Sequence, residues 1–133
     1  MTADVEVTVE RPREGVALAA LIGDLDQRSG RGLHDRVADI VRDEPTYLVL
    51  DLSNIGFCDS TGLSVLIGIW HLMHQSGGSV AVVGVPTRLQ RMLTLTGVDE
   101  LLPVHPTAAD AVRAGPAGLP AEPGFGSGIS DGR

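Results

Sequence analysis

Three features are scarce in this sequence, and each scarcity excludes a class of protein. The 133 residues include one cysteine, Cys58, which excludes an internal disulfide framework and is typical of a reducing compartment. Aromatic residues make up 3% of the chain, so the core must be built from aliphatic side chains. Basic residues are fewer than acidic ones, and the formal net charge of −7 argues against a surface that binds nucleic acid directly.

Long apolar segments are also missing. The longest one, residues 63–73, is interrupted by Ser64, Gly68 and His71, and it is shorter than the roughly 20 residues that a membrane-spanning helix needs. Residues 1–13 are polar and charged, which is unlike a secretory signal peptide. We therefore expect a cytoplasmic protein with no membrane partner.

Length and composition predict one domain. The chain lies within the roughly 100–200 residues of a single domain, and a hydrophobic content of 43% is enough for a core. From Gly115 onward glycine and proline dominate, and such a segment cannot bury enough apolar surface to offset its ordering entropy. We expect a folded domain over residues 3–114 and a disordered tail over residues 115–133.

Strand-like and helix-like patterns alternate along the domain. Val5, Val7 and Val9 predict a half-buried strand, which pairs as a hairpin with an apolar strand over residues 16–22. The later elements are a helix over 32–42, a buried strand over 47–50, a helix from 60, a strand over 79–84, a helix opened by Pro86 and closed by Gly97, an edge strand over 101–104 and a helix over 108–114 capped by Thr107. This order predicts an α/β fold: a mixed, mostly parallel sheet with an N-terminal antiparallel hairpin and about four helices.

The most informative stretch, residues 47–62, reads Y-L-V-L-D-L-S-N-I-G-F-C-D-S-T-G. We interpret residues 51–58 as a loop that leaves the buried strand, and Asp59 and Ser60 as the start of the next helix. Open α/β sheets carry functional groups at that position, and the free N–H groups of a helix start favour a phosphate. That helix is apolar nearly all round, which indicates either deep burial or a face covered by another protein.

The motifs give little support to an enzyme or a metal centre. Ser60 lies in C-D-S-T-G rather than in a G-x-S-x-G nucleophile elbow, and a Walker loop, a Rossmann glycine motif and a Cys/His cluster are missing. Asp24 and Asp26 could bind a metal, although a capped loop into a helix is the more ordinary interpretation. His71 and His74 lie three residues apart but have no third ligand at a suitable spacing. We expect no catalytic residue, metal or cofactor.

Three motifs in order carry a resemblance to a known family. They are G-D-L-D after the second strand, D-S-T-G-L after the third, and V-P-T-R-L-Q-R-M-L-T-L-T-G-V over residues 85–98. Together they resemble the anti-sigma factor antagonists, which belong to the sulfate-transporter and anti-sigma antagonist (STAS) domains, over nearly all of residues 5–114. Asp24 stands where that family usually has Glu, and Cys58 where it often has a larger apolar residue.

The resemblance implies a switchable binding protein. Such proteins bind an anti-sigma factor that is also a serine kinase, and this binding releases the sigma factor for transcription. The kinase uses ATP to phosphorylate the serine after the motif's Asp, here Ser60, and a metal-dependent serine/threonine phosphatase restores the binding form. The expected partner-binding residues are Asp24, Asp26, Asp59, Ser60, Thr61, Gly62, Arg88 and Arg91.

Two other functions stay open at this point. The protein could be a STAS scaffold subunit of a transporter or stress-signalling complex that never switches, with Ser60 as an ordinary helix N-cap. An α/β hydrolase-like enzyme is a third and weaker possibility, because the motifs above do not favour it.

Overall fold

Two buried strands, β2 (Val16–Leu25) and β3 (Tyr47–Cys58), form the centre of a five-stranded sheet. The strand order is β1-β2-β3-β4-β5; β1 (Glu6–Arg13) is antiparallel to β2, and β4 (Ser79–Val83) and β5 (Val104–His105) extend the sheet in parallel. The predicted mixed sheet with an N-terminal hairpin is therefore confirmed, in a computed structural model that describes residues 5–42 and 45–116.

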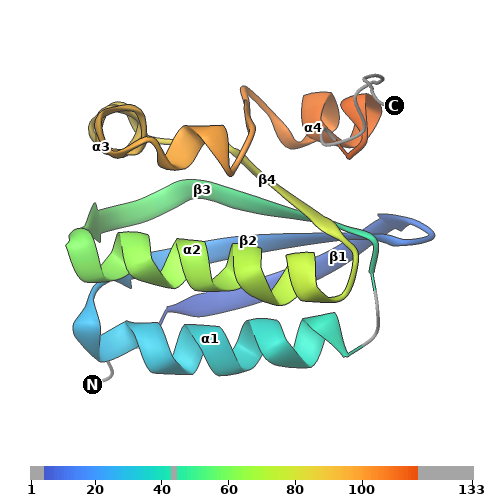
Figure 1. Cartoon of the computed structure of the whole chain (residues 1–133), viewed down its shortest axis with the longest axis horizontal. Helices are drawn as coiled ribbons and strands as arrows, with labels where there is room; N and C mark the ends of the chain where they lie inside the picture. Colours follow the sequence, from blue (N-terminus) through green and yellow to red (C-terminus); the bar gives the residue numbers. More distant parts are fainter. Residues whose placement is uncertain (1–4, 43–44, 117–133) are drawn as a thin grey trace, which may run out of the picture.

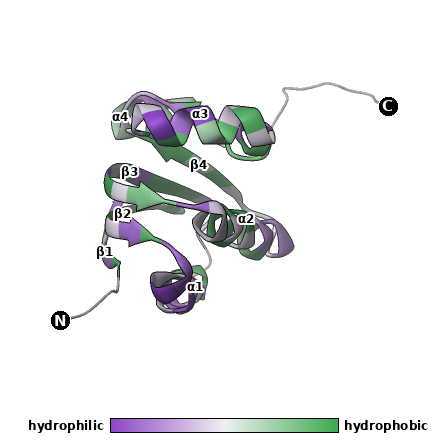
Figure 2. Cartoon of the chain, turned by 90° about the vertical axis from the view of Figure 1, so that its left-hand side faces the viewer, coloured by the Kyte–Doolittle hydropathy of each residue, from purple (hydrophilic) through white to green (hydrophobic). Residues whose placement is uncertain are grey.

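The crossover helices α1 (Gln27–Val41), α2 (Ser60–Gln75) and α3 (Thr87–Thr96) pack on one face of the sheet. Each parallel strand is added on the same side of the one before, so right-handed crossovers place all three on that face. Figures 1 and 2 show α1 and α2 side by side, with α3 further along the sheet, near β4. Their buried leucines, isoleucines and valines form one aliphatic cluster with the strands. The helix α4 (Ala108–Ala114) packs on the opposite face, where the buried Tyr47 hydroxyl donates a hydrogen bond of 2.9 Å to the Ala111 carbonyl.

Both central strands continue past the ends that the sequence predicts. The predicted stop at residues 23–26 and the predicted loop over residues 51–58 are wrong, because Leu25 still pairs with Cys58. Polar residues in these segments point to solvent while Leu25 and Ile55 are buried, so each strand end is buried on one face only. Irregular register between β2 and β3 hides that alternation from a simple period of two.

Helix α1 begins at Gln27 rather than at residue 32. The side chain of Asp26 caps it by accepting hydrogen bonds from the backbone N–H groups of Arg28 and Ser29 at 3.0 and 3.1 Å. The Ser29 hydroxyl in turn accepts a hydrogen bond from the backbone N–H of Asp26, at 3.1 Å. This reciprocal capping is the helix-start signal that the hydrophobic periodicity of residues 32–42 did not include.

The segment after α3 also differs from its prediction. Gly97 ends α3 in the left-handed conformation, at a φ of 79°, as expected. A 3-10 helix, η1 (Val98–Glu100), follows, so the edge strand predicted over residues 101–104 lies at Val104–His105 instead. Pro86 is the N-cap of α3 rather than its first helical residue, and Thr107 caps α4 as predicted.

The predicted tail lies outside the described residues, apart from Gly115 and Pro116. Because glycine and proline dominate its composition, we expect removal of residues 117–133 to shift the thermal midpoint by no more than about one or two degrees. Differential scanning calorimetry of the full and the shortened chain would measure this. A loss of several degrees would show that the removed residues stabilise the domain.

Among the residues that the structure describes, 5–42 and 45–116, no helix is both long and apolar enough to cross a bilayer.

Candidate functional site: the shared start of α1 and α2

The carboxyl ends of β2 and β3 lie side by side at one edge of the sheet, because the two strands are parallel neighbours. Helix α1 starts directly after β2 and α2 directly after β3, so two helix N-termini open at this edge. The backbone N–H of Asp59 donates to the Leu25 carbonyl at 3.3 Å and joins the two turns. The edge therefore joins two capped helix starts at the end of parallel strands, which is the position that the sequence predicts for the site.

Asp59 caps α2, and this leaves Ser60 available. One carboxylate oxygen of Asp59 accepts a hydrogen bond of 2.9 Å from the backbone N–H of Gly62. Ser60 is the first residue of the helix and is exposed to solvent, as is Thr61. The interpretation of Ser60 as the N-cap, which belongs to the scaffold alternative, is wrong because Asp59 fills that position.

Gly62 has a packing role. It is buried, and a Cβ atom at this position would lie 2.4 Å from the Leu25 carbonyl oxygen and 2.8 Å from the Cys58 Sγ. Only glycine lets the first turn of α2 approach the end of β2 this closely. Gly62 therefore sets the position of Ser60 while its own atoms are covered.

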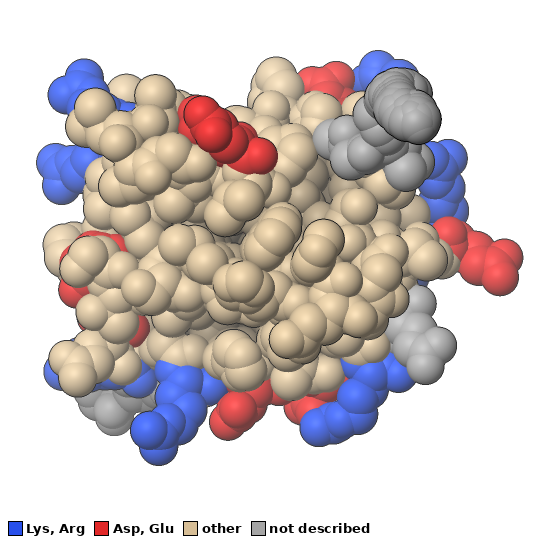
Figure 3. Space-filling model, in the orientation of Figure 1, with Lys and Arg blue, Asp and Glu red and all other residues tan. Residues whose placement is uncertain are grey.

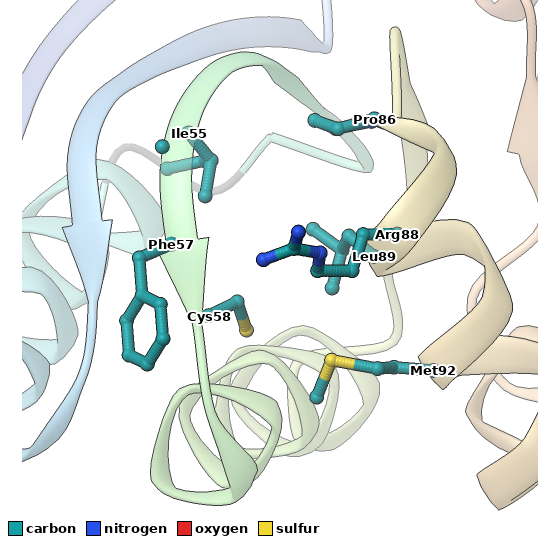
Figure 4. Close-up of a pocket in the computed structure, with 8 residues that line it drawn as sticks. Ile55, Phe57, Cys58, Pro86, Arg88, Leu89 and Met92 are labelled. Carbon is teal, nitrogen blue, oxygen red and sulfur yellow. The ribbon is translucent and has the colours of Figure 1, made fainter.

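An apolar pocket opens between the end of β3 and the start of α3, close to the start of α2 (Figure 4). Its lining residues come from these two elements: Ile55, Gly56, Phe57, Cys58, Pro86, Arg88, Leu89 and Met92. Phe57 is 48% exposed, so its ring adds apolar surface at the edge of this pocket. In Figure 4 the Arg88 guanidinium reaches from α3 toward Cys58, so it offers a charged group at the rim of an apolar hollow.

Cys58 is a poor nucleophile in this setting. Burial, and to a smaller extent the neighbouring Asp59 carboxylate, raise the pKa of the Cys58 thiol to about 11. The thiol therefore stays protonated at neutral pH, and its Sγ lies 3.6 Å from the Asp59 carbonyl oxygen, to which it donates. Cys58 therefore contributes to the pocket wall as a small, uncharged side chain.

The structure brings together most of the predicted partner-binding residues. Asp26 and Asp59 are half-buried and cap α1 and α2. Asp24 is exposed, and its carboxylate lies against Gly56 of the pocket wall, where an added Cβ would be 3.1 Å from it. Arg88 lines the pocket, while Arg91 is exposed on the same helix but outside the lining.

Sequence reasoning missed two apolar residues of this site, Phe57 and Met92. Phe57 lies in the segment that was predicted as a loop, and Met92 lies in α3, where the sequence indicated only the two Arg residues as partner-binding. A large aromatic residue beside D-S-T-G was the one available signal, and it is not specific. In the part of the chain that the structure describes, no three His, Cys, Asp or Glu side chains are grouped as metal ligands.

The Asp59 cap leads to a stability prediction. We expect Asp59→Ala to lower the free energy of unfolding by about 1 kcal/mol, because the Gly62 N–H loses its acceptor at the start of α2. Asp59→Asn keeps an acceptor oxygen at the same position and should retain most of the stability. Urea unfolding of the three proteins measures the difference, and an Asp59→Ala protein as stable as the parent would mean that this cap contributes nothing.

A five-stranded sheet of this order, with a helix that opens on D-S-T-G, defines a domain of the STAS type. The STAS domain family model matches residues 9–111, and the chain belongs to this family.

Individual relatives are anti-sigma factor antagonists. The chain is 31% identical over 113 residues to the anti-sigma-F factor antagonist RsfB of Mycobacterium tuberculosis, and the match covers 84% of this chain and 92% of RsfB. Over 110 residues it is 29% identical to an anti-sigma F factor antagonist of Paenibacillus polymyxa, covering 82% and 93% of the two chains. The crystal structure of an anti-sigma factor antagonist from Mycobacterium paratuberculosis has a TM-score of 0.74 at 30% identity, covering 86% of this chain and 97% of that one.

Proposed function

We propose that this protein is an anti-sigma factor antagonist, whose unphosphorylated form binds an anti-sigma factor serine kinase and so releases a sigma factor. Phosphorylation of Ser60 ends the binding, and a serine/threonine phosphatase restores it. The chain acts by binding alone and catalyses no reaction. The observation that carries the proposal is the exposed Ser60, at the first position of α2 and next to an apolar pocket.

The geometry suits a kinase substrate for a physical reason. A hydroxyl that caps a helix would lose its hydrogen bond on modification, whereas here Asp59 makes the cap. The added phosphate would also lie at a helix N-terminus, where the helix dipole favours negative charge. Ser60 can therefore change its charge without any need for the domain to refold.

The pocket residues are the proposed anchor for the kinase. Phe57, Leu89 and Met92 offer apolar contacts, and Arg88 adds a cation. Three acidic residues belong to the same edge of the sheet: Asp24 lies over the pocket wall, and Asp26 and Asp59 cap α1 and α2. A partner surface with an apolar centre and a charged rim has the usual composition of a specific interface.

Charge reversal on α3 tests this surface. We expect Arg88→Glu to weaken kinase binding about tenfold or more, because a new carboxylate would join an already acidic rim, and Arg91→Glu to act in the same direction with a smaller effect. Arg113→Glu changes net charge equally on α4, on the other face of the sheet, and should leave the affinity unchanged. Equal affinities for all three variants and the parent would remove α3 from the interface.

A pull-down tests the proposed function itself. Unmodified protein and Ser60→Asp protein are used as baits in a lysate of the source cells, and the bound proteins are identified by mass spectrometry. The proposal predicts an anti-sigma factor with a kinase domain on the unmodified bait and its loss from the Ser60→Asp bait. Recovery of the same partners on both baits, or of no anti-sigma factor on either, would contradict it.

A further inference from the structure

Helix α2 has an outward face that carries no formal charge. None of its 16 residues is Asp, Glu, Lys or Arg, and neither is any residue between Asp59 and Arg88. Figure 3 shows the consequence as an uncharged area across the middle of this face of the molecule, with charged side chains around the rim.

One stripe of α2 points outward along its whole length. Its members follow each other at steps of four and three residues, and we call them the α2 stripe: Ser60, Ser64, Ile67, His71 and His74. Ile67 at the centre is half-buried and the other four are exposed. This spacing is the seam along which two helices pack side by side.

The two flanks of the stripe are fixed by neighbours. On one flank α1 packs closely, since a Cβ on Gly30 would lie 2.7 Å from Val65 and a Cβ on Gly68 would lie 3.7 Å from His34. Part of the excess apolar surface of α2 is thus covered by α1 within the same chain, as the deep-burial interpretation of this helix predicts. On the other flank the half-buried Trp70 remains beside the stripe.

The Trp70 ring contacts both histidines of the α2 stripe. Its ring stacks on His74 with centroids 4.7 Å apart and planes 11° from parallel, and it meets His71 edge-on at 5.0 Å. These contacts restrict the imidazoles, so a ligand that binds them has less side-chain entropy to remove. The end of α2 opposite Ser60 therefore presents two ordered N–H donor groups.

The stripe is complementary to itself in an antiparallel arrangement. Ser60 and His74 are equally far from Ile67 along the helix, about 10.5 Å each way. A twofold axis through Ile67 therefore places Ser60 opposite His74 of a second copy, while Ser64 and His71, three and four residues from Ile67, lie about one residue out of register. Two copies that each carry a net charge of −7 repel each other, and an uncharged face is where they can approach with the least repulsion.

Phosphorylation would supply the attraction that this stripe lacks. A phosphoserine adds about −1.5 to −2 charges and three acceptor oxygens, and an imidazole donates an N–H to such an oxygen and attracts it further when protonated. The symmetric arrangement makes that contact twice. The Asp59 carboxylate beside Ser60 opposes it, but it is half-buried and its oxygen is bonded to Gly62.

We infer that the protein phosphorylated at Ser60 pairs with a second copy of itself, with the two α2 stripes antiparallel and each phosphate bound by His74 of the other copy. This inference rests on the proposed function, in which Ser60 is the phosphorylated residue. The unmodified protein has only one half-buried isoleucine and neutral hydroxyls to offer along the stripe, so it stays a monomer. Pairing covers the Ser60 end of α2, so the phosphatase acts on the phosphorylated monomer that is in equilibrium with the pair.

The test uses protein with phosphoserine installed at position 60 during synthesis, which needs no kinase. Sedimentation equilibrium should give the 13.9 kDa chain mass for unmodified protein and twice that mass for the phosphorylated form, with a dissociation constant at least tenfold lower than that of the unmodified form. Emission from the only tryptophan, Trp70, should change with concentration in the phosphorylated protein alone.

Two variants of the phosphorylated protein locate the contact. His74→Ala and Ile67→Arg should both return it to a monomer, while His34→Ala, on the neighbouring helix α1, should leave the pair intact. A phosphorylated protein that stays monomeric at several hundred micromolar, or a pair that survives His74→Ala, overturns the inference. A kinase that ignores Ser60 would contradict the proposed function and leave this measurement unaffected.

Discussion

Ser60→Asp protein and phosphorylated protein should bind the anti-sigma factor kinase at least a hundredfold more weakly than unmodified protein, while both keep the native fold. Ser60 is exposed at the start of α2 and lies beside the apolar pocket of Phe57 and Met92. An interface that fits a small neutral hydroxyl would have to desolvate a new anion without a partner for it. That desolvation costs several kcal/mol, and each 1.4 kcal/mol is a tenfold change in affinity.

The fold itself should change little in stability. Negative charge in the first turn of a helix is favourable by roughly 0.3–1 kcal/mol at an exposed site. The Asp59 carboxylate next to Ser60 repels the new charge and offsets part of that gain. Circular dichroism of the modified proteins should therefore give the parent spectrum and a similar thermal midpoint, which separates a binding defect from unfolding.

Two further variants make the comparison specific. Ser60→Ala should stay bound to the kinase and resist phosphorylation, because it keeps the neutral, small side chain and removes the acceptor. Thr61→Ala should leave phosphorylation largely intact, although Thr61 is equally exposed and adjacent. Isothermal titration calorimetry on this set gives the affinities. If the Ser60→Asp and phosphorylated forms bind as tightly as the parent, the switch lies elsewhere and the scaffold function is favoured.

Gly62→Ala should lower the free energy of unfolding by about 3 kcal/mol, near the upper end of overpacking effects in cores. The new methyl group would lie 2.4 Å from the Leu25 carbonyl oxygen, a backbone atom of β2 that cannot rotate away. Either α2 shifts from the sheet or β2 bends, and in both cases the start of α2 leaves its position beside the pocket. Urea unfolding measures the loss.

Gly68→Ala is the matched control in the same helix. A Cβ at that position would lie 3.7 Å from the His34 ring, which is an ordinary contact, and alanine is preferred over glycine in a helix by roughly 0.5–1 kcal/mol. We therefore expect this variant to be as stable as the parent or more stable. If Gly62→Ala and Gly68→Ala changed stability equally, the close contact of α2 with β2 would have no energetic importance.

The sequence predicts the order of strands and helices and the start of α2, because these depend on local patterns. The apolar run at residues 47–50, D-S-T-G and the helical spacing after it are all short-range signals. The ends of β2 and β3 depend instead on pairing between Leu25 and Cys58, which lie far apart in the sequence. A strand end that is buried on one face only and has irregular register shows no regular alternation of apolar and polar residues, so the lengths of β2 and β3 could not be predicted.

In the candidate site, too, some features depend on local sequence and others on contacts between distant segments. Ser60 and Asp59 could be placed at a helix N-terminus from local sequence, since N-caps have strong residue preferences. The pocket could not, because its lining residues come from β3 and α3, which lie next to each other only when the sheet is assembled. The packing role of Gly62 likewise depends on a β2 carbonyl that no local pattern reveals.

The most direct measurement is site-resolved mass spectrometry after incubation of the purified protein with its cognate anti-sigma factor kinase and ATP. The account predicts a gain of one phosphate, located on Ser60, together with the loss of the complex that unmodified protein forms with the kinase. A kinase that binds the protein but leaves Ser60 unmodified, or that phosphorylates Thr61 instead, would contradict it.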